Sequence, residues 1–153
     1  GVIAVEGLCV RQGGFALEGV SFAVPAGAYA VLMGRTGAGK TTLLEAIAGL
    51  RRVSGGRVVL AGRDVTALPP AARNVGYVPQ DAVLFKTMTV GENLAFALRV
   101  RDLPRAEVEA RVAELAGRLG LADLLDRPAV GLSGGEAQRV GLGRALAFRP
   151  PVL

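Results

Sequence analysis

The sequence predicts an α/β domain with a strand-rich first part and a helical second part. Three observations support this prediction. Short β-branched and apolar runs fill the beginning of the chain, a glycine-rich loop separates an apolar run from an amphipathic helix, and apolar residues recur at helical spacing from Val90 onward. With 153 residues and 51% hydrophobic content, the chain is long enough to bury a core.

The strands are expected where apolar runs are bounded by turn residues. Residues 27–33, GAYAVLM, are apolar throughout and follow a proline-glycine turn, which predicts a buried strand. Other segments have strand composition: 1–10 and 15–24 with the turn RQGG between them, 57–65 as a hairpin turning at Ala61 and Gly62, and the short run 74–79.

Helices are expected where apolar residues recur every three or four positions. In residues 40–50 the four residues Leu43, Leu44, Ile47 and Leu50 fall on one face, which predicts a helix. Pro104 suits the first turn of a later helix. The remaining helical segments are 90–100, 105–120 and 121–125.

The charge balance is basic but unspecific. The formal charge is +5 and the pI is near 10.3, which ordinarily favours an anionic partner such as nucleic acid or a membrane surface. Lys40 and Lys86 are the only lysines, however, and the arginines are scattered among acidic residues. A solvated arginine-rich surface is the simpler interpretation, so no nucleic-acid partner is expected, although a nucleic-acid footprint stays open.

Two further features limit the class of protein. Cys9, the single cysteine, has no partner for an internal disulfide, and its apolar context predicts a small buried side chain. No apolar run reaches the roughly 18 to 20 residues that a membrane span needs, because Pro25 and several glycines interrupt the longest one. Any link to a membrane is therefore expected through a partner.

The strongest motif is GRTGAGKT, which fits the phosphate-binding pattern G-x-x-x-x-G-K-S/T between an expected strand and an expected helix. Glycines allow positive φ, so that successive N–H groups converge on an anion. Lys40 is expected to reach the β and γ phosphates, Thr41 to ligate Mg²⁺, and Thr42 to offer another hydroxyl. The predicted nucleotide-binding set is Gly34, Arg35, Thr36, Gly37, Ala38, Gly39, Lys40, Thr41 and Thr42.

Taken alone, this loop predicts a P-loop NTPase and leaves the reaction open, because many unrelated enzymes share it. A glycine-rich turn that merely joins a strand to a helix is the alternative.

A second motif, LSGGEAQR at 132–139, predicts an unusual helix start. Ser133 is a preferred N-cap, and Glu136 follows at the spacing of a capping box. Gly134 and Gly135 then occupy the first turn, where a glycine costs a helix roughly 0.5 to 1 kcal/mol relative to alanine. Close approach of an anion to bare N–H groups explains that cost, and an ordinary capped surface helix is the alternative.

A P-loop followed, after a helical insert, by LSGGEAQR closely resembles the ATP-binding cassette (ABC) ATPases, whose signature is L-S-G-G-Q/E-x-Q-R. The resemblance implies a RecA-like core with an N-terminal antiparallel β subdomain and an inserted α-helical subdomain. It also implies ATP and Mg²⁺ as cofactors and a head-to-tail pair of ATPase domains. Ser133, Gly134 and Gly135, with Glu136 beside them, would then contact the γ-phosphate of ATP held by the opposite subunit.

The resemblance also points to two further residues. Gln80 lies where the Q-loop glutamine of the family touches Mg²⁺ and the attacking water, so it joins Lys40 as a candidate catalytic residue; a polar strand-end residue is the alternative. Phe15 is the candidate for the aromatic ring that stacks on adenine, a contact worth about 1–3 kcal/mol per base elsewhere. Arg11 aligns there with some relatives, and Phe15 is otherwise a core residue.

Within the family, GRTGAGKTTLLEAIAGL and LPPAARNVGYVPQDAVLF look most like importer ATPases for molybdate, tungstate or sulfate. This implies transmembrane permease subunits, which would contact the GENLAFAL face, and a peripheral location on the cytoplasmic face of the membrane. A non-transport ABC ATPase of the translation-factor type is the alternative. The signature argues against a simple P-loop kinase or GTPase.

The predicted organisation is a partial ABC ATPase domain over 1–153. Residues 1–80 would form the β subdomain and P-loop core, 81–135 the Q-loop and helical subdomain, and 136–153 the signature helix and the start of the Walker B strand. The Asp-Glu pair and switch histidine of the family are not in this sequence, so we expect weak nucleotide binding without turnover.

Departures from the family pattern are local. Lys86 and Thr87 stand where proline and histidine are frequent, and Gly141 and Gly143 where alanine is common. The two glycines should weaken their helix by roughly 1–2 kcal/mol unless a neighbour packs unusually close.

Overall fold

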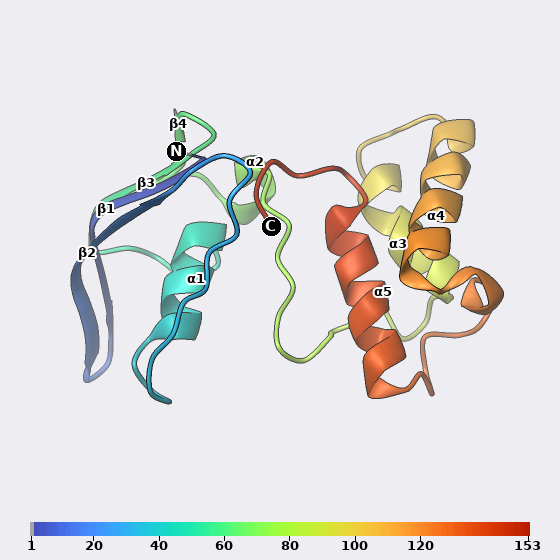
Figure 1. Cartoon of the computed structure of the whole chain (residues 1–153), viewed down its shortest axis with the longest axis horizontal. Helices are drawn as coiled ribbons and strands as arrows, with labels where there is room; N and C mark the ends of the chain where they lie inside the picture. Colours follow the sequence, from blue (N-terminus) through green and yellow to red (C-terminus); the bar gives the residue numbers. More distant parts are fainter. Residues whose placement is uncertain (1) are drawn as a thin grey trace. The chain divides into compact units, whose positions relative to one another are not determined.

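A computed structural model describes residues 2–153, which form two compact units (Figure 1). The β unit comprises the residues up to Val75 together with Val152, and the helical unit comprises Gly76–Pro151 and Leu153. The first unit contains an antiparallel sheet and the second is helical, so the predicted α/β class with a strand-rich first part is confirmed. The finer division at residues 80 and 135 stays a prediction.

The sheet of the β unit has the order β2-β1-β3-β4, and all its pairs are antiparallel. Central β1 aligns Val5 with Phe22 of β2 on one side and with Val58 of β3 on the other. The turn residues Ala61 and Gly62 both have positive φ, 49° and 79°, as a tight hairpin requires. The bounds are β1 Ile3–Gln12, β2 Phe15–Val24, β3 Gly55–Leu60 and β4 Arg63–Asp64.

Helix α1, Lys40–Ala48, packs its Leu43 and Ile47 into the core of the β unit (Figure 1). Leu44 and Leu50, which were predicted to share this face, do not lie in the core, because these residues are 49% and 55% exposed. Leu44 lies about 100° around the helix from Leu43. Leu50 lies beyond Gly49, which ends the helix at φ 84° and turns the chain away. The core consists of Val5, Leu8, Val10, Leu43, Ala46, Ile47, Val58, Leu60, Val65 and Val152.

The buried strand predicted over 27–33 is not formed. This segment has no regular structure, and Tyr29 and Met33 are 93% and 85% exposed. A strand needs neighbouring backbone to complete its hydrogen bonds, and no other segment of residues 2–153 pairs with this one. The apolar composition of this segment therefore did not determine its conformation.

The strand predicted over 74–79 is also absent apart from one residue. Val75 forms an isolated parallel bridge with Val152, which is all that residues 2–153 show of the predicted final strand. The short helix α2, Pro70–Arg73, precedes it and was not predicted, since four residues are too few for a helical pattern.

The helical unit contains the helices that the sequence predicted. Figure 1 shows α3, α4 and α5 side by side, and their apolar faces form its core. Pro104 is the N-cap of α4. The bounds are α3 Val90–Arg99, α4 Arg105–Leu119, the 3₁₀ turn Ala122–Leu124 and α5 Gly134–Leu146.

One buried polar side chain fixes the loop before α3. Asn93 is fully buried on α3. Its Oδ1 accepts from the Phe85 N–H at 2.9 Å, and its Nδ2 donates to the carbonyls of Phe85 and Thr89.

Cys9 is half-buried rather than buried, because its Sγ lies at the strand surface between the Gly7 carbonyl and the Gly19 N–H.

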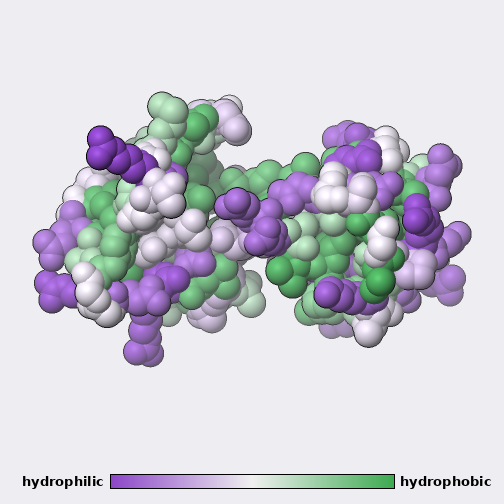
Figure 2. All heavy atoms as spheres, turned by 90° about the horizontal axis from the view of Figure 1, so that it is seen from below, coloured by the Kyte–Doolittle hydropathy of each residue, from purple (hydrophilic) through white to green (hydrophobic). Residues whose placement is uncertain are grey.

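The visible surface of each unit mixes hydrophilic and hydrophobic residues (Figure 2). In the β unit the exposed large apolar residues are Tyr29, Val31, Leu32, Met33, Leu44 and Leu50. None of the helices in residues 2–153 has both the length and the apolar character needed to cross a membrane.

The two interior glycines of α5 have different surroundings. A Cβ on Gly143 would lie 2.5 Å from Leu94 Cδ2 and 2.9 Å from Leu119 Cδ1, so neighbours do pack unusually close there. A Cβ on Gly141 would meet only Ala82 Cβ at 3.5 Å, an ordinary contact. Close packing therefore explains one glycine and not the other.

We expect the two glycines to respond to alanine in opposite directions. Gly141→Ala should raise the free energy of unfolding by about 0.5–1 kcal/mol, since alanine restricts the unfolded chain and favours the helix. Gly143→Ala should lower it by about 1–3 kcal/mol, because fully buried Leu94 has no room to move away. Chemical denaturation of both variants measures this, and stabilisation by Gly143→Ala would contradict the packing described.

Candidate functional site

The glycine-rich loop of the β unit is open to solvent. Residues 34–38 are exposed and have no regular structure, and the Ala38 N–H donates to the Arg35 carbonyl at 3.1 Å to close a turn. Gly37 and Gly39 have φ 82° and 90°, which only glycine adopts easily. A Cβ on Gly37 would meet nothing within 4 Å, so the loop leaves room for a ligand against its backbone.

Helix α1 begins directly after this loop. Gly39 is its N-cap and supplies no side-chain acceptor. The first N–H groups of a helix have no acceptor within the helix, and they carry the positive end of its dipole. The helix start in the β unit therefore suits an anion.

Lys40 lies over the same loop. Its ammonium Nζ donates to the carbonyls of Gly34 at 2.7 Å and Arg35 at 2.8 Å. Both acceptors are neutral, and a charged phosphate oxygen forms a stronger hydrogen bond with an ammonium group than a neutral carbonyl does. The loop thus holds a cation where it can exchange its carbonyl partners for phosphate oxygens.

The structure places Phe15 beside the loop. A Cβ on Gly39 would lie 2.6 Å from Phe15 Cζ and 2.9 Å from Leu17 Cδ2, so both side chains press on the last glycine of the motif. Phe15 is half-buried. Arg11 is exposed and pairs with Glu18 at 3.5 Å. The proximity of Phe15 leaves its contact with adenine a prediction.

The helix start predicted at 133–136 is confirmed in the helical unit. Ser133 is the N-cap of α5 and accepts from the Glu136 N–H at 3.2 Å, while the Ser133 N–H donates to the Glu136 carboxylate at 2.7 Å. The Ser133 backbone N–H first, and its hydroxyl second, hold the pKa of Glu136 below the ordinary value. The capping box thus favours the charged carboxylate.

Gly134 and Gly135 are exposed, and a Cβ on either would meet nothing within 4 Å. Packing within residues 2–153 therefore does not require glycine at these positions. Both residues are exposed, and their contact with a ligand stays a prediction.

Gln80 is exposed in the helical unit, and the segment that follows it rests on α5. Ala82 faces Gly141, and the Arg144 guanidinium donates to the Val83 carbonyl at 2.6 Å and lies 4.9 Å from the Phe85 ring centroid. Burial lowers the pKa of Arg144. The roles of Gln80 in metal binding and catalysis stay predictions.

Mg²⁺ fits the loop through a hydroxyl ligand. Thr41 is exposed in the first turn of α1, where its hydroxyl is available. Residues 2–153 contain no group of three His, Cys, Asp or Glu side chains that would hold a metal ion by themselves. Mg²⁺ bound with nucleotides usually keeps several waters and takes its other ligands from phosphates, so one hydroxyl is a suitable protein contribution.

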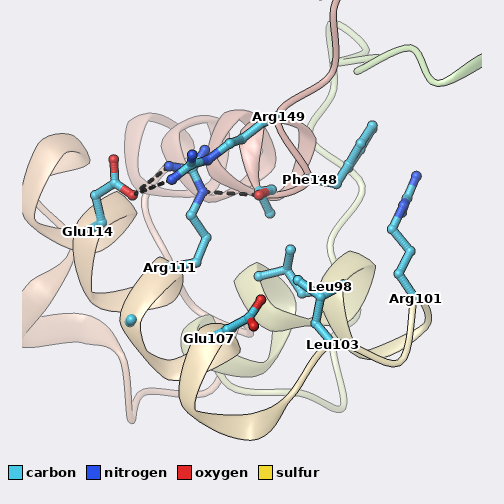
Figure 3. A pocket seen from close by; sticks show the side chains of 10 residues that line it. Leu98, Arg101, Leu103, Glu107, Arg111, Glu114, Phe148 and Arg149 are labelled. Carbon is cyan, nitrogen blue, oxygen red and sulfur yellow. Dashed lines mark hydrogen bonds and ion pairs between the residues drawn. The ribbon is translucent and has the colours of Figure 1, made fainter.

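A pocket of about 460 Å³ lies at the other end of α5 (Figure 3). There Arg111 donates to the carbonyls of Leu146 and Ala147, and both Arg111 and Arg149 meet the Glu114 carboxylate. The hydrogen bond from Arg111 is the main cause that holds the pKa of Glu114 below its ordinary value. A 13-residue helix is about 20 Å long, so this pocket is separate from the signature.

Sequence analysis missed Arg73, the buried arginine of the β unit. Its guanidinium donates four hydrogen bonds to carbonyl oxygens, two of them on α1. Backbone acceptors leave no side-chain pattern in the sequence, so nothing in the residue spacing indicated this contact.

The sequence comparisons agree with both motifs. The family described as ABC transporter matches residues 17–153, which include the P-loop, Gln80 and the signature. The chain belongs to the ABC transporter family. This match confirms the predicted P-loop NTPase fold class.

Similar proteins are import ATP-binding proteins by name. The chain is 46% identical over 152 residues to a molybdate/tungstate import ATP-binding protein of Thermococcus kodakarensis, covering 99% of this chain and 46% of that protein. It is 45% identical over 153 residues to a sulfate/thiosulfate import ATP-binding protein of Nocardia farcinica, covering 99% and 46%.

An uncharacterized ABC transporter ATP-binding protein of Sinorhizobium fredii is 51% identical over 127 residues, covering 83% of this chain and 38% of that protein. The chain thus spans less than half the length of these relatives.

The capping box of this ABC chain makes α5 sensitive to acid. Because the folded pKa of Glu136 is lowered, its stabilisation is present above the unfolded pKa and is lost as pH falls through the folded pKa. We expect wild type to unfold at a higher temperature than Glu136→Gln at neutral pH, and the difference to shrink as pH falls below the ordinary carboxyl range. Thermal unfolding across pH measures this.

Ser133→Ala provides the control for the cause. It removes the hydroxyl, which is the second cause of the lowered pKa, but keeps the backbone N–H, which contributes most. NMR titration should therefore show a Glu136 pKa in Ser133→Ala that rises only part of the way to the ordinary value. A stability difference between wild type and Glu136→Gln that is unchanged in acid would refute the role of the carboxylate.

Proposed function

We propose that this chain is the nucleotide-binding part of an ABC ATPase subunit, which binds and hydrolyses ATP with Mg²⁺ to drive solute import. One observation carries the proposal: within a chain of this family, helix α1 follows the exposed glycine-rich loop 34–38, and helix α5 begins with the exposed Gly134 and Gly135. The start of α1 has the cation of Lys40 and the hydroxyls of Thr41 and Thr42, which a nucleotide needs. The start of α5 has only its backbone and the Ser133 cap.

The β unit supplies the nucleotide site in this proposal. Backbone N–H groups from Gly37 to Thr41 surround the phosphates, and Lys40 exchanges its two carbonyl partners for phosphate oxygens. Thr41 contributes a hydroxyl ligand to Mg²⁺, which supplies charge neutralisation at the phosphates when bound. Phe15, which already touches the loop, extends an apolar surface toward the base.

The helical unit supplies the second half of a site. The N-terminus of α5 has open glycines but carries the Glu136 carboxylate, which repels phosphate. It is therefore a weaker anion site than α1 by itself, and it suits a phosphate that another chain already holds. A head-to-tail pair places Ser133, Gly134 and Gly135 of each chain against the nucleotide of the other.

The partner surface proposed for permease subunits lies on α3. Met88, Glu92, Phe96, Arg99 and Val100 line a pocket of about 310 Å³ there, and the Phe85 and Phe96 ring centroids are 4.5 Å apart. An apolar hollow with charges at its edge fits a short helix of a membrane subunit. The proposed location is the cytoplasmic face of the membrane, which the names of the import ATP-binding relatives support.

The proposed cargo is molybdate, tungstate or sulfate. The names of the Thermococcus kodakarensis and Nocardia farcinica relatives support an oxyanion, and they favour import over a translation-factor role. Uptake assays of radiolabelled tungstate and sulfate, with the cognate permease, distinguish the two classes of oxyanion. Uptake of an unrelated solute alone would refute this assignment.

Lys40→Ala should weaken ATP binding by the chain at least about tenfold, because it removes the loop cation. Titration calorimetry with Mg-ATP measures the affinity, and Lys86→Ala, which changes the other lysine outside the loop, serves as the matched control. Equal ATP affinity in Lys40→Ala and wild type would refute the proposed nucleotide site.

Ser133→Arg tests the second half-site. We expect it to leave ATP binding by the single chain within about twofold of wild type and to abolish ATP-dependent association, because the larger side chain blocks the α5 backbone. Sedimentation velocity with and without ATP measures association. If Ser133→Arg still associates on addition of ATP as wild type does, the head-to-tail arrangement is wrong.

A further inference from the structure

Arg73 is a buried cation that the phosphate-binding motif does not include. It ends α2 and is 6% exposed. Its Nη1 donates to the carbonyls of Ala46 at 2.9 Å and Ile47 at 3.0 Å, both in the last turn of α1. Its Nε and Nη2 donate to the carbonyls of Leu68 at 2.9 Å and Thr66 at 3.0 Å.

The charge of Arg73 is balanced by backbone rather than by an acid. No ion pair joins it to any carboxylate in residues 2–153. Its burial lowers its pKa, yet an arginine remains charged in proteins. The last carbonyls of α1 carry the negative end of the helix dipole, so they provide the favourable partner for this cation.

The end of α1 is shaped to admit the guanidinium. Gly49 follows the helix with φ 84°, and a Cβ there would collide with Arg73 Nε. Glycine is thus required both by the backbone conformation and by the approach of the side chain. The same guanidinium reaches the 66–68 loop, so it joins the end of α1 to the segment after β4.

We propose that Arg73 is a positioning residue for the P-loop: it fixes the C-terminal end of α1, so that the amides at the other end stay aimed at phosphate. This inference rests on the proposed nucleotide site. Helix α1 has nine residues and is about 13 Å long, and a short rigid helix whose C-terminal end shifts carries its N-terminal end with it. Small displacements at a binding loop are costly.

The helical unit offers a chemically matched comparison. Arg111 of α4 donates to the carbonyls of Leu146 at 2.8 Å and Ala147 at 3.0 Å, at the C-terminal end of α5 (Figure 3). Its side chain is 14% exposed. Arg111 therefore has the same kind of contact as Arg73 but on a helix that carries no P-loop.

The experiment compares Mg-ATP affinity of the wild-type chain, Arg73→Met, Arg73→Lys and Arg111→Met by titration calorimetry, at a temperature where circular dichroism shows each folded. Arg73→Met should weaken ATP binding about tenfold, and Arg73→Lys by less, since it keeps the charge but loses the planar fork. Arg111→Met should stay within about twofold of wild type.

A second control separates positioning from stability. Val5→Ala truncates a core side chain of the β unit that is 1% exposed, so it lowers the melting temperature without removing any hydrogen bond of Arg73. A merely structural role of Arg73 predicts lower melting temperatures for Val5→Ala and Arg73→Met and unchanged ATP affinity in both. Positioning predicts that only the Arg73 variant loses affinity.

The outcomes are distinct. If wild type binds ATP and the Arg73 variants bind it equally well, the positioning role is refuted while the nucleotide site stands. If wild type does not bind ATP, the nucleotide site itself is refuted. If Arg73→Met does not fold, Arg73→Lys decides by the same criterion: weakened ATP binding with Arg111→Met unchanged supports positioning, and unchanged binding overturns it.

Discussion

The unpaired N–H groups at the start of a helix are the constraint on which this structure depends. Both α1 and α5 have glycine beside these donors: half-buried Gly39 precedes α1, and exposed Gly134 and Gly135 begin α5. They differ in what lies beside the donors. Gly39 leaves α1 without a side-chain cap, and Lys40 adds a positive charge. Ser133 and Glu136 satisfy two donors of α5 and add a negative charge. The same backbone device therefore gives a strong and a weak anion site in one chain.

The arginines account for much of the order around these helices. Arg73 donates to the last carbonyls of α1, and Arg111 donates to the last carbonyls of α5. The exposed Arg139 donates to the carbonyls of Leu119 and Gly120 at the end of α4. Arginine suits this task, because its planar guanidinium presents several donors and stays charged when buried. Part of the basic composition therefore has a structural cause. The interpretation of the arginines as a solvated surface did not include this cause.

Apolar residues show where local pattern and conformation separate. The helices 90–99 and 105–119 agree closely with their apolar spacing, since a helix completes its hydrogen bonds within its own segment. Residues 27–33 are as apolar as the formed strands, yet they stay irregular and exposed. A strand depends on another segment for its hydrogen bonds, and apolar character does not specify which segment that is.

The sequence by itself determined the longer helices, the hairpins, the capping box at Ser133 and the identity of the loop residues around Lys40, because each depends on residues close together in the chain. Only the tertiary structure decided that Arg73 would reach α1 from α2, that Phe15 would press on Gly39, and that Leu94 would exclude a side chain at Gly143. It also decided that 27–33 would find no partner among residues 2–153. The physical reason is that these contacts join segments far apart in sequence. In each, a side chain meets backbone atoms or the space beside a glycine, and neither leaves a pattern of residue types in the sequence.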